Sequence, residues 1–151
     1  MINFDLSGKS SLNREIVFKI STDVNNFHTI MPNYFKSLDI LSEDESGIIV
    51  SEKINFLGQS VKVKTRHFVS PPNMHKVFIL TGPLKGTSFI ENYEPSSSGT
   101  LISISVNLKI NGLLKYIPFV NNILRKKMSR VMLEFINCAE QHSIENQLSS
   151  S

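Results

Sequence analysis

The chain has 151 residues, of which 40% are hydrophobic and 19% are charged, and its net charge is +3 with a pI near 9.0. This composition is that of a globular domain and excludes a disordered chain. The excess of positive charge is too small to indicate nucleic-acid binding, because structured nucleic-acid binders usually concentrate basic residues on one face. The sequence contains no run of about 18 apolar residues, so it predicts no membrane span, and its N-terminus lacks the pattern of a signal peptide.

Cysteine and histidine usage gives the next expectations. A single cysteine, Cys138, cannot close a disulfide within the chain, and a cytoplasmic location is the simpler interpretation. His28, His75 and His142 are scattered, without the spacing of a metal site. We therefore expect no cofactor and no metal, and no nucleic-acid partner.

The first third of the chain reads as one strand and two short helices. Apolar residues alternate with polar ones over 2–7, which predicts a strand. A helical pattern in two pieces follows: Asn13 or Ser11 can cap the first piece and Asp23 the second. Pro32 ends this pattern, because the residue before a proline is displaced from the helical region.

The middle of the chain has a hydrophobic period of two. Six strands are expected there, over 36–42, 48–56, 61–69, 74–81, 87–94 and 100–110. The connectors between them are short and rich in Gly, Pro, Ser or Asn, which predicts consecutive hairpins and an antiparallel meander.

The last third contains the one sustained helical period of the sequence. Apolar residues recur there at spacings of three and four: Val120, Leu124, Met128, Val131, Phe135 and Ala139, with Ile123, Met132 and Ile136 widening the stripe. This pattern predicts an amphipathic helix from near Pro118 to Glu145, about 40 Å long. A helix of this length with one apolar face needs a broad apolar surface, which the predicted sheet can supply.

This order of elements resembles the helix-grip fold. The segment IVFKISTDVNNFHTIMP is similar to the helical segment of the START-related superfamily, including its polyketide cyclase/dehydrase and lipid-transport branch. The TGPLKGT loop before FIENYEP resembles the Gly-Pro loop of the same superfamily, although the tryptophan often found in the first segment is absent. The resemblance implies an α+β helix-grip domain over residues 1–146: a curved antiparallel sheet of about seven strands wraps a long C-terminal helix, two short helices follow the first strand, and residues 147–151 form a frayed tail.

The resemblance also implies a hydrophobic cavity between sheet and helix, with loops that cover its mouth. LGQS and GPLKG are the candidates for this lid, and their glycines would allow hinge motion. We therefore predict binding or transport of a small hydrophobic or amphipathic ligand, such as a lipid, an isoprenoid or a polyketide-like compound. Enzymatic activity is the less expected outcome. Two alternatives stay open: a cyclase/dehydratase-type enzyme with His67 as acid or base, and a protein-interaction module that uses the outer apolar face of the sheet.

Symmetric pairing of the strands about their turns indicates which side chains face the cavity. It places Glu52 opposite Thr65, His67 opposite Lys76, and Ile90 opposite Ile104. The predicted ligand-binding residues are Glu52, Thr65, His67, Lys76, Phe78, Asn92, Ile104, Met128 and Phe135. His67 is expected to contact a carbonyl, Lys76 an acidic head group, and Glu52 to orient His67. Because one β-bulge reverses the facing of later side chains, these assignments depend on the register.

The other face of the sheet gives the expectations about partners. The same pairing places Phe68, Val77, Ile79, Phe89 and Tyr93 outside, where they suit a homodimer contact, so a monomer and a homodimer both stay open. A basic group on the C-terminal helix indicates either solubility or contact with an anionic membrane surface: Arg125, Lys126, Lys127 and Arg130.

Overall fold

The computed structural model describes residues 2–56 and 58–150, with side chains up to residue 146. The elements follow in the order β1 (Ile2–Ser10), α1 (Arg14–Thr22), the 3-10 turn η1 (Val24–Asn26), α2 (Phe27–Ile30), β2 (Phe35–Asp44), β3 (Gly47–Phe56), β4 (Gln59–Ser70), β5 (Met74–Ile79), β6 (Ser88–Ser96), β7 (Gly99–Leu108), the 3-10 turn η2 (Gly112–Tyr116) and α3 (Val120–Ser150).

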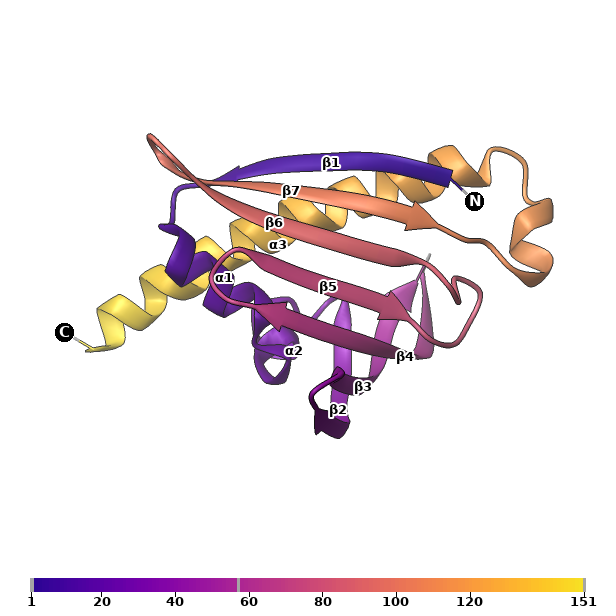
Figure 1. Ribbon diagram of the computed structural model, residues 1–151, viewed down its shortest axis with the longest axis horizontal. Coiled ribbons are helices and arrows are strands. Elements are labelled where there is room, and N and C mark those ends of the chain that lie inside the picture. The colour runs from indigo at the N-terminus through magenta and orange to yellow at the C-terminus, as the bar shows by residue number, and fades with distance from the viewer. Residues whose placement is uncertain (1, 57, 151) are drawn as a thin grey trace.

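All seven strands form one antiparallel sheet in the order β1-β7-β6-β5-β4-β3-β2. In Figure 1, β2 and β3 run across the direction of β5, β6 and β7, so the sheet is strongly bent around α3. Register shifts in β2, between Phe35 and Ser37 and between Ile40 and Ser42, contribute to this bend. The predicted α+β helix-grip architecture is confirmed.

The two short helices close one end of the bent sheet. Asn13 is the N-cap of α1, and its side chain accepts a hydrogen bond of 3.0 Å from the Ile16 N–H, as the sequence predicted. Asp23 makes no side-chain capping bond, and the second predicted helix is the turn η1 followed by α2. The helical segment ends at Ile30, two residues before Pro32.

The start of α3 differs from the prediction. The helix begins at Val120 rather than near Pro118, because Phe119 has a φ of 59° and so lies outside the right-handed helical region. At the other end the helix includes residues 147–150 of the tail that was expected to fray, and residue 151 lies outside the described residues.

The predicted apolar stripe of α3 faces the sheet. Val120, Leu124 and Ala139 are buried, and so are Met132 and Ile136. Ile123, by contrast, is 42% exposed and does not belong to the stripe. The carboxylate of Glu140 holds the far half of the helix to the end of β1, where it accepts hydrogen bonds from the Ser10 hydroxyl (3.2 Å) and the Ser11 N–H (2.8 Å).

The strand register explains which side chains reach the helix side of the sheet. In the β3–β4 hairpin Val50 pairs with Thr65, an offset of two residues from the prediction that leaves every side chain on the predicted face. In the β4–β5 hairpin His67 pairs with Val77, an offset of one residue that reverses β5. A second one-residue offset, in which Ile90 pairs with Ser105, restores the predicted facing of β7. Only β5 and β6 are therefore inverted.

Candidate ligand-binding site

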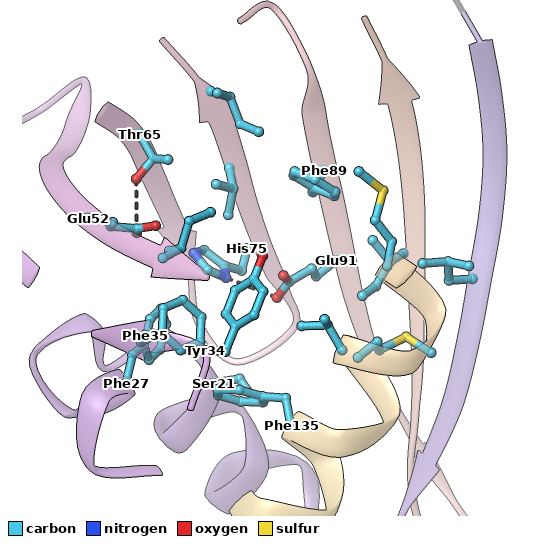
Figure 2. Close-up of a pocket in the computed structure, with 18 of the residues that line it drawn as sticks. Ser21, Phe27, Tyr34, Phe35, Glu52, Thr65, His75, Phe89, Glu91 and Phe135 are labelled. Atoms are coloured by element: carbon cyan, nitrogen blue, oxygen red, sulfur yellow. Dashed lines mark hydrogen bonds and ion pairs between the residues drawn. The ribbon is translucent and has the colours of Figure 1, made fainter. Parts of the chain in front are cut away.

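A cavity of about 250 Å³ lies between the sheet and α3. Most of its wall is apolar and comes from both layers of the fold: Leu6, Ile54, Phe56, Val63, Val77, Ile79, Phe89, Ile104, Leu124, Met128 and Val131. Figure 2 shows side chains from the strands and from α3 converging on this space.

An aromatic group from α2, β2 and α3 forms one part of the wall. The ring of Phe27 lies 5.0 Å from that of Phe35 and 5.6 Å from that of Phe135, the latter pair edge to face. Figure 2 shows these three rings together beside Tyr34. These ring contacts hold α2 in place beside the polar groups of the cavity, where the ring of Phe27 lies 6.3 Å from that of His67.

Leu84 adds a further part of the wall, from the loop that carries the predicted lid sequence GPLKG. This loop is tied to the segment after β7: the Asn111 amide donates to the Lys85 carbonyl oxygen (2.8 Å), and the Thr87 hydroxyl to that of Lys109 (3.1 Å). Leu84 itself is buried in the core. The loop is thus an anchored wall in this structure. Hinge motion of GPLKG and LGQS stays a prediction.

A chain of polar side chains crosses the apolar wall. On β3 and β4, Glu52 Oε1 lies 3.0 Å from the Thr65 hydroxyl and 3.1 Å from His67 Nε2, and all three residues are buried. Thr65 and His67 share a face of β4 because they are two residues apart. The symmetric pairing predicted the shared face of these three residues, although Thr65 pairs with Val50 rather than with Glu52.

The chain continues across β5 and β6. His67 Nδ1 lies 3.0 Å from Nε2 of His75, and the two rings stack at 5.2 Å. His75 Nδ1 lies 3.0 Å from Oε1 of Glu91, which also accepts a 2.7 Å hydrogen bond from the Tyr93 hydroxyl. Hydrogen bonds therefore connect Glu52 to Tyr93 across four neighbouring strands.

The number of protons shared in these hydrogen bonds determines the net charge of the row of polar side chains, which we call the polar chain. Three hydrogen bonds link Glu52, His67, His75 and Glu91 in a row, and each needs one proton. Two neutral imidazoles supply two N–H protons. With both carboxylates ionised and both imidazoles neutral, the four side chains carry two negative charges, and one further proton for the third hydrogen bond reduces this to one, so the polar chain is negatively charged in either state.

The surroundings shift the pKa values of several of these groups. Burial raises the pKa of Glu91, but the charge and hydrogen bond of His75 and the hydrogen bond from Tyr93 outweigh it, so the pKa lies below its usual range. Burial and the nearby Glu52 carboxylate raise the pKa of Tyr34 to about 12. Burial, followed by the charge of Glu91, raises the pKa of Tyr93 well above its usual value. Both tyrosines are thus neutral at pH 7.

Each glutamate keeps one oxygen for a ligand. Oε1 of Glu52 and Oε1 of Glu91 each accept two hydrogen bonds, whereas among the described residues no group donates to either Oε2. Both residues line the cavity, and Figure 2 shows them pointing into the same space. Lys127 is the one lysine or arginine in the described lining, and it forms no ion pair with either glutamate.

The structure brings together only part of the predicted set. Glu52, Thr65, His67, Ile104, Met128 and Phe135 line the cavity, and whether they bind a ligand stays a prediction. The predicted facing of Lys76, Phe78 and Asn92 is wrong: these residues alternate with the cavity-lining side chains of β5 and β6 and lie on the other face of the sheet. The one-residue offset after β4 is the cause.

Because of the same register offset, most of the apolar residues that were predicted on the outer face of the sheet lie on its inner face. Val77, Ile79, Phe89 and Tyr93 line the cavity rather than the outer face. Phe68 remains outside at 40% exposure and Phe78 joins it at 38%, next to the basic residues with which they pair, Lys76 and Arg66. The broad apolar surface on which the homodimer contact rested is therefore not present on this face.

Among the cavity residues that the sequence prediction missed, His75 and Glu91 are the two that complete the polar chain. Each directly precedes a residue that was predicted instead, Lys76 or Asn92. The missing information was the length of the turn after β4: Ser70 pairs with Met74, so three residues connect the strands where the prediction assumed an even number. Among the described residues, no group of His, Cys, Asp and Glu is arranged to hold a metal ion.

Comparison with known proteins supports the fold. Neither a sequence family nor a curated protein matches the chain by sequence. Solved structures do match: a START superfamily protein from Mycobacterium smegmatis has 13% identity and a TM-score of 0.76, over 93% of this chain and 95% of that one. Ara h 8.0201 has 16% identity and a TM-score of 0.73, over 95% of this chain and 98% of that one.

A further match is the di-domain ARO/CYC StfQ from the steffimycin biosynthetic pathway, with 12% identity and a TM-score of 0.80. The match covers 97% of this chain but 52% of StfQ, so the chain spans about half the length of that protein. Similarity at these identities shows the fold, and the predicted resemblance to the START-related helix-grip superfamily is confirmed at that level.

No helix within residues 2–56 and 58–150 is long and apolar enough to cross a membrane.

Proposed function

We propose that this chain binds a small amphipathic molecule whose apolar body fills the cavity and whose polar end donates hydrogen bonds to Glu52 and Glu91. The observation that carries the proposal is the pair of carboxylate oxygens without a hydrogen-bond partner, on two residues of a mostly apolar wall. Mostly apolar walls with a few convergent polar groups are typical of ligand sites. The similarity in fold to a START superfamily protein and to aromatase/cyclase structures is consistent with a hydrophobic ligand.

The size of the cavity limits the ligand. A cavity of about 150 Å³ holds benzene, and drug-sized ligands occupy roughly 300–1,000 Å³. A volume of about 250 Å³ lies between these values and suits a body of one or two fused rings or a short branched chain. A long-chain lipid does not fit without movement of the walls.

The charge of the polar chain selects the head group. Its net negative charge and its free acceptor oxygens favour a hydroxyl or an ammonium group and repel a carboxylate. The head group predicted from Lys76 was acidic, and that assignment falls because Lys76 lies outside the cavity. Burial strengthens this discrimination, since charges interact more strongly in a site with little water.

The structure favours binding over the alternative of acid–base catalysis by His67. Both ring nitrogens of His67 are within hydrogen-bond distance of partners, Nε2 of Glu52 and Thr65 and Nδ1 of His75. A general acid or base must reach the proton that it transfers, at about 2.6–3.2 Å. His67 would have to break an existing hydrogen bond to do so, whereas Glu52 and Glu91 line the cavity and each has an oxygen, Oε2, without a hydrogen-bond partner.

A matched set of naphthalene derivatives tests the proposal by titration calorimetry at pH 7. Methylnaphthalene reports on the apolar cavity alone, and naphthalene methanol, naphthalene methylamine and naphthoate add three head groups to the same rings. The alcohol and the amine are expected to bind at least tenfold more tightly than naphthoate, which corresponds to about 1.4 kcal/mol. Absence of binding by all four compounds would refute the proposed function.

Two variants assign the preference to the carboxylate. Glu91→Gln keeps an oxygen that accepts from Tyr93 but removes the charge, and is expected to reduce the preference for the amine over naphthoate. Glu94→Gln removes the same charge from an exposed position of β6 outside the described lining, and is expected to leave the preference unchanged. If naphthoate binds most tightly and Lys127→Gln abolishes its binding, Lys127 holds the head group and the polarity proposed here is wrong.

A further inference from the structure

A cluster of exposed apolar side chains lies between β7 and α3. Within seven residues, Leu113 is 85% exposed, Tyr116 74%, Ile117 43% and Phe119 78%. We call these four residues the apolar tip. In Figure 1 the segment projects beyond the end of the sheet, next to the start of α3. Isolated exposed apolar residues are common on proteins, but four large ones in one short segment indicate an interaction surface.

The backbone holds this surface outward. Phe119 has a φ of 59°, a conformation that is strained for a bulky residue, and yet the residue is 78% exposed. Packing in the folded chain therefore does not offset the strain. Leu114, within the same segment, points the other way and packs against the core cluster that contains Leu84 and Leu124. The tip is thus mounted on the core and its apolar side chains are directed away from it.

The charge around the tip identifies the kind of partner. From residue 95 to residue 133 the sequence contains no Asp or Glu, whereas it contains six basic residues: Lys109, Lys115, Arg125, Lys126, Lys127 and Arg130. Lys115 lies within the tip segment itself, and the last four belong to the first three turns of α3. Of these four, Lys127 also lines the cavity, and Arg125 and Lys126 border a surface depression together with Asp5. Exposed apolar and aromatic side chains bordered by lysine and arginine are the composition of a surface that binds anionic lipid headgroups and inserts into the interface.

We propose that the apolar tip docks this protein on an anionic membrane surface, with Leu113, Tyr116 and Phe119 inserted at the headgroup level. The occupant is a lipid bilayer rather than a second copy of the chain, because a second copy would bring the same basic residues together. The proposal is independent of the head-group preference of the cavity. From the sequence, the basic residues of α3 were considered as a membrane contact because of their charge alone. The apolar tip adds exposed apolar side chains next to the start of that helix.

A single tryptophan tests insertion directly, because the chain contains none. Phe119→Trp places the reporter in the tip, and Phe68→Trp places a matched reporter on the outer face of β4, at an aromatic position that is also exposed. With vesicles of phosphatidylcholine and phosphatidylserine, the emission of the Phe119→Trp variant is expected to shift to shorter wavelength, and brominated lipid is expected to quench it. Vesicles of phosphatidylcholine alone are expected to give a weaker response, and added salt to reduce it. The Phe68→Trp emission is expected to stay unchanged.

Sedimentation with the same vesicles provides the second measurement. The double variant Leu113→Ser/Phe119→Ser, altered only at exposed positions, is expected to lose at least tenfold in vesicle affinity, and Phe68→Ser to lose none. Equal responses of the two tryptophan reporters would overturn the proposal, and so would unchanged sedimentation of the double variant. A shift of the Phe119→Trp emission that depends on protein concentration and needs no lipid would instead assign the tip to contact between copies.

Discussion

Removal of His75 is the most direct test of the polar chain. The imidazole is 2% exposed and makes two 3.0 Å contacts, one with His67 Nδ1 and one with Glu91 Oε1. His75→Phe keeps a ring of similar shape and removes both contacts. A hydrogen bond to a charged group contributes roughly 1.5–3 kcal/mol, and a neutral one about 0.5–1.5 kcal/mol.

The sum for the two contacts is about 2–4.5 kcal/mol, and burial of the more apolar phenyl ring offsets part of it. We therefore expect the free energy of unfolding to fall by about 3 kcal/mol. A domain of this size has roughly 5–15 kcal/mol of stability, so the variant stays folded at 25 °C. Urea unfolding at pH 7, followed by circular dichroism, measures the difference from the midpoint and the slope.

A double-mutant cycle separates the chain from the packing of the ring. If His75 and Glu91 act through their contact, the losses in His75→Phe and Glu91→Gln are not additive, and the coupling energy exceeds about 0.5 kcal/mol. His28→Phe, on an exposed position of α2, is the control and is expected to change stability by less than about 0.5 kcal/mol. A loss below 1 kcal/mol in His75→Phe, with additive effects in the cycle, would show that the chain of hydrogen bonds does not form.

Three further predictions concern other parts of the same structure. The pKa of Tyr34 is raised from 10.0 to about 12, so its contribution to stability is complete below pH 10 and is lost as the pH rises to 12, roughly 3 kcal/mol in all. Tyr34→Phe is expected to remove this part of the alkaline loss in urea titrations. Ile104→Trp, within the cavity wall, is expected to reduce methylnaphthalene affinity at least tenfold in calorimetry while the variant stays folded. Gly99→Ala is expected to lower the free energy of unfolding by about 2 kcal/mol or more in thermal unfolding, because φ is +146° and a Cβ would overlap the Ser10 carbonyl oxygen. Gly58→Ala is the control: its φ of +87° is also unfavourable for alanine, but a Cβ would meet open space, so the loss of stability should be smaller.

The fold could be predicted from the sequence because its signals are long and redundant. The stripe from Val120 to Ala139 extends over five turns, so the misassignment of Ile123 does not change which face of α3 meets the sheet. The strands were separable because every connector carries turn residues. The beginning of α3 was not predictable in the same way, since Pro118 suits a first helical turn and no local pattern indicates the positive φ of Phe119.

Only part of the site was predictable, because the facing of a strand depends on whether the error in its register is an odd or an even number of residues. An error of two residues, as between β3 and β4, preserves the facing of Glu52 and Thr65, whereas an error of one residue reverses an entire strand. The turn after β4 and the turn after β6 each introduced an error of one, so the second cancelled the first. Ile104 was therefore placed correctly beyond two inverted strands, and the polar residues of β5 and β6 were exchanged for their neighbours.

The polar chain is not explained by the stability of the fold. A sheet that packs against an amphipathic helix needs only apolar side chains on its inner face, and burial of charged groups removes them from water at a cost of several kcal/mol. Apolar residues of similar volume at Glu52, His67, His75 and Glu91 would satisfy the same packing. The chain is instead complete except at two carboxylate oxygens, and both of these residues line the cavity. An arrangement that makes each internal contact and leaves one oxygen of each glutamate without a partner, on residues that line the cavity, supports the proposed recognition of a hydrogen-bond donor.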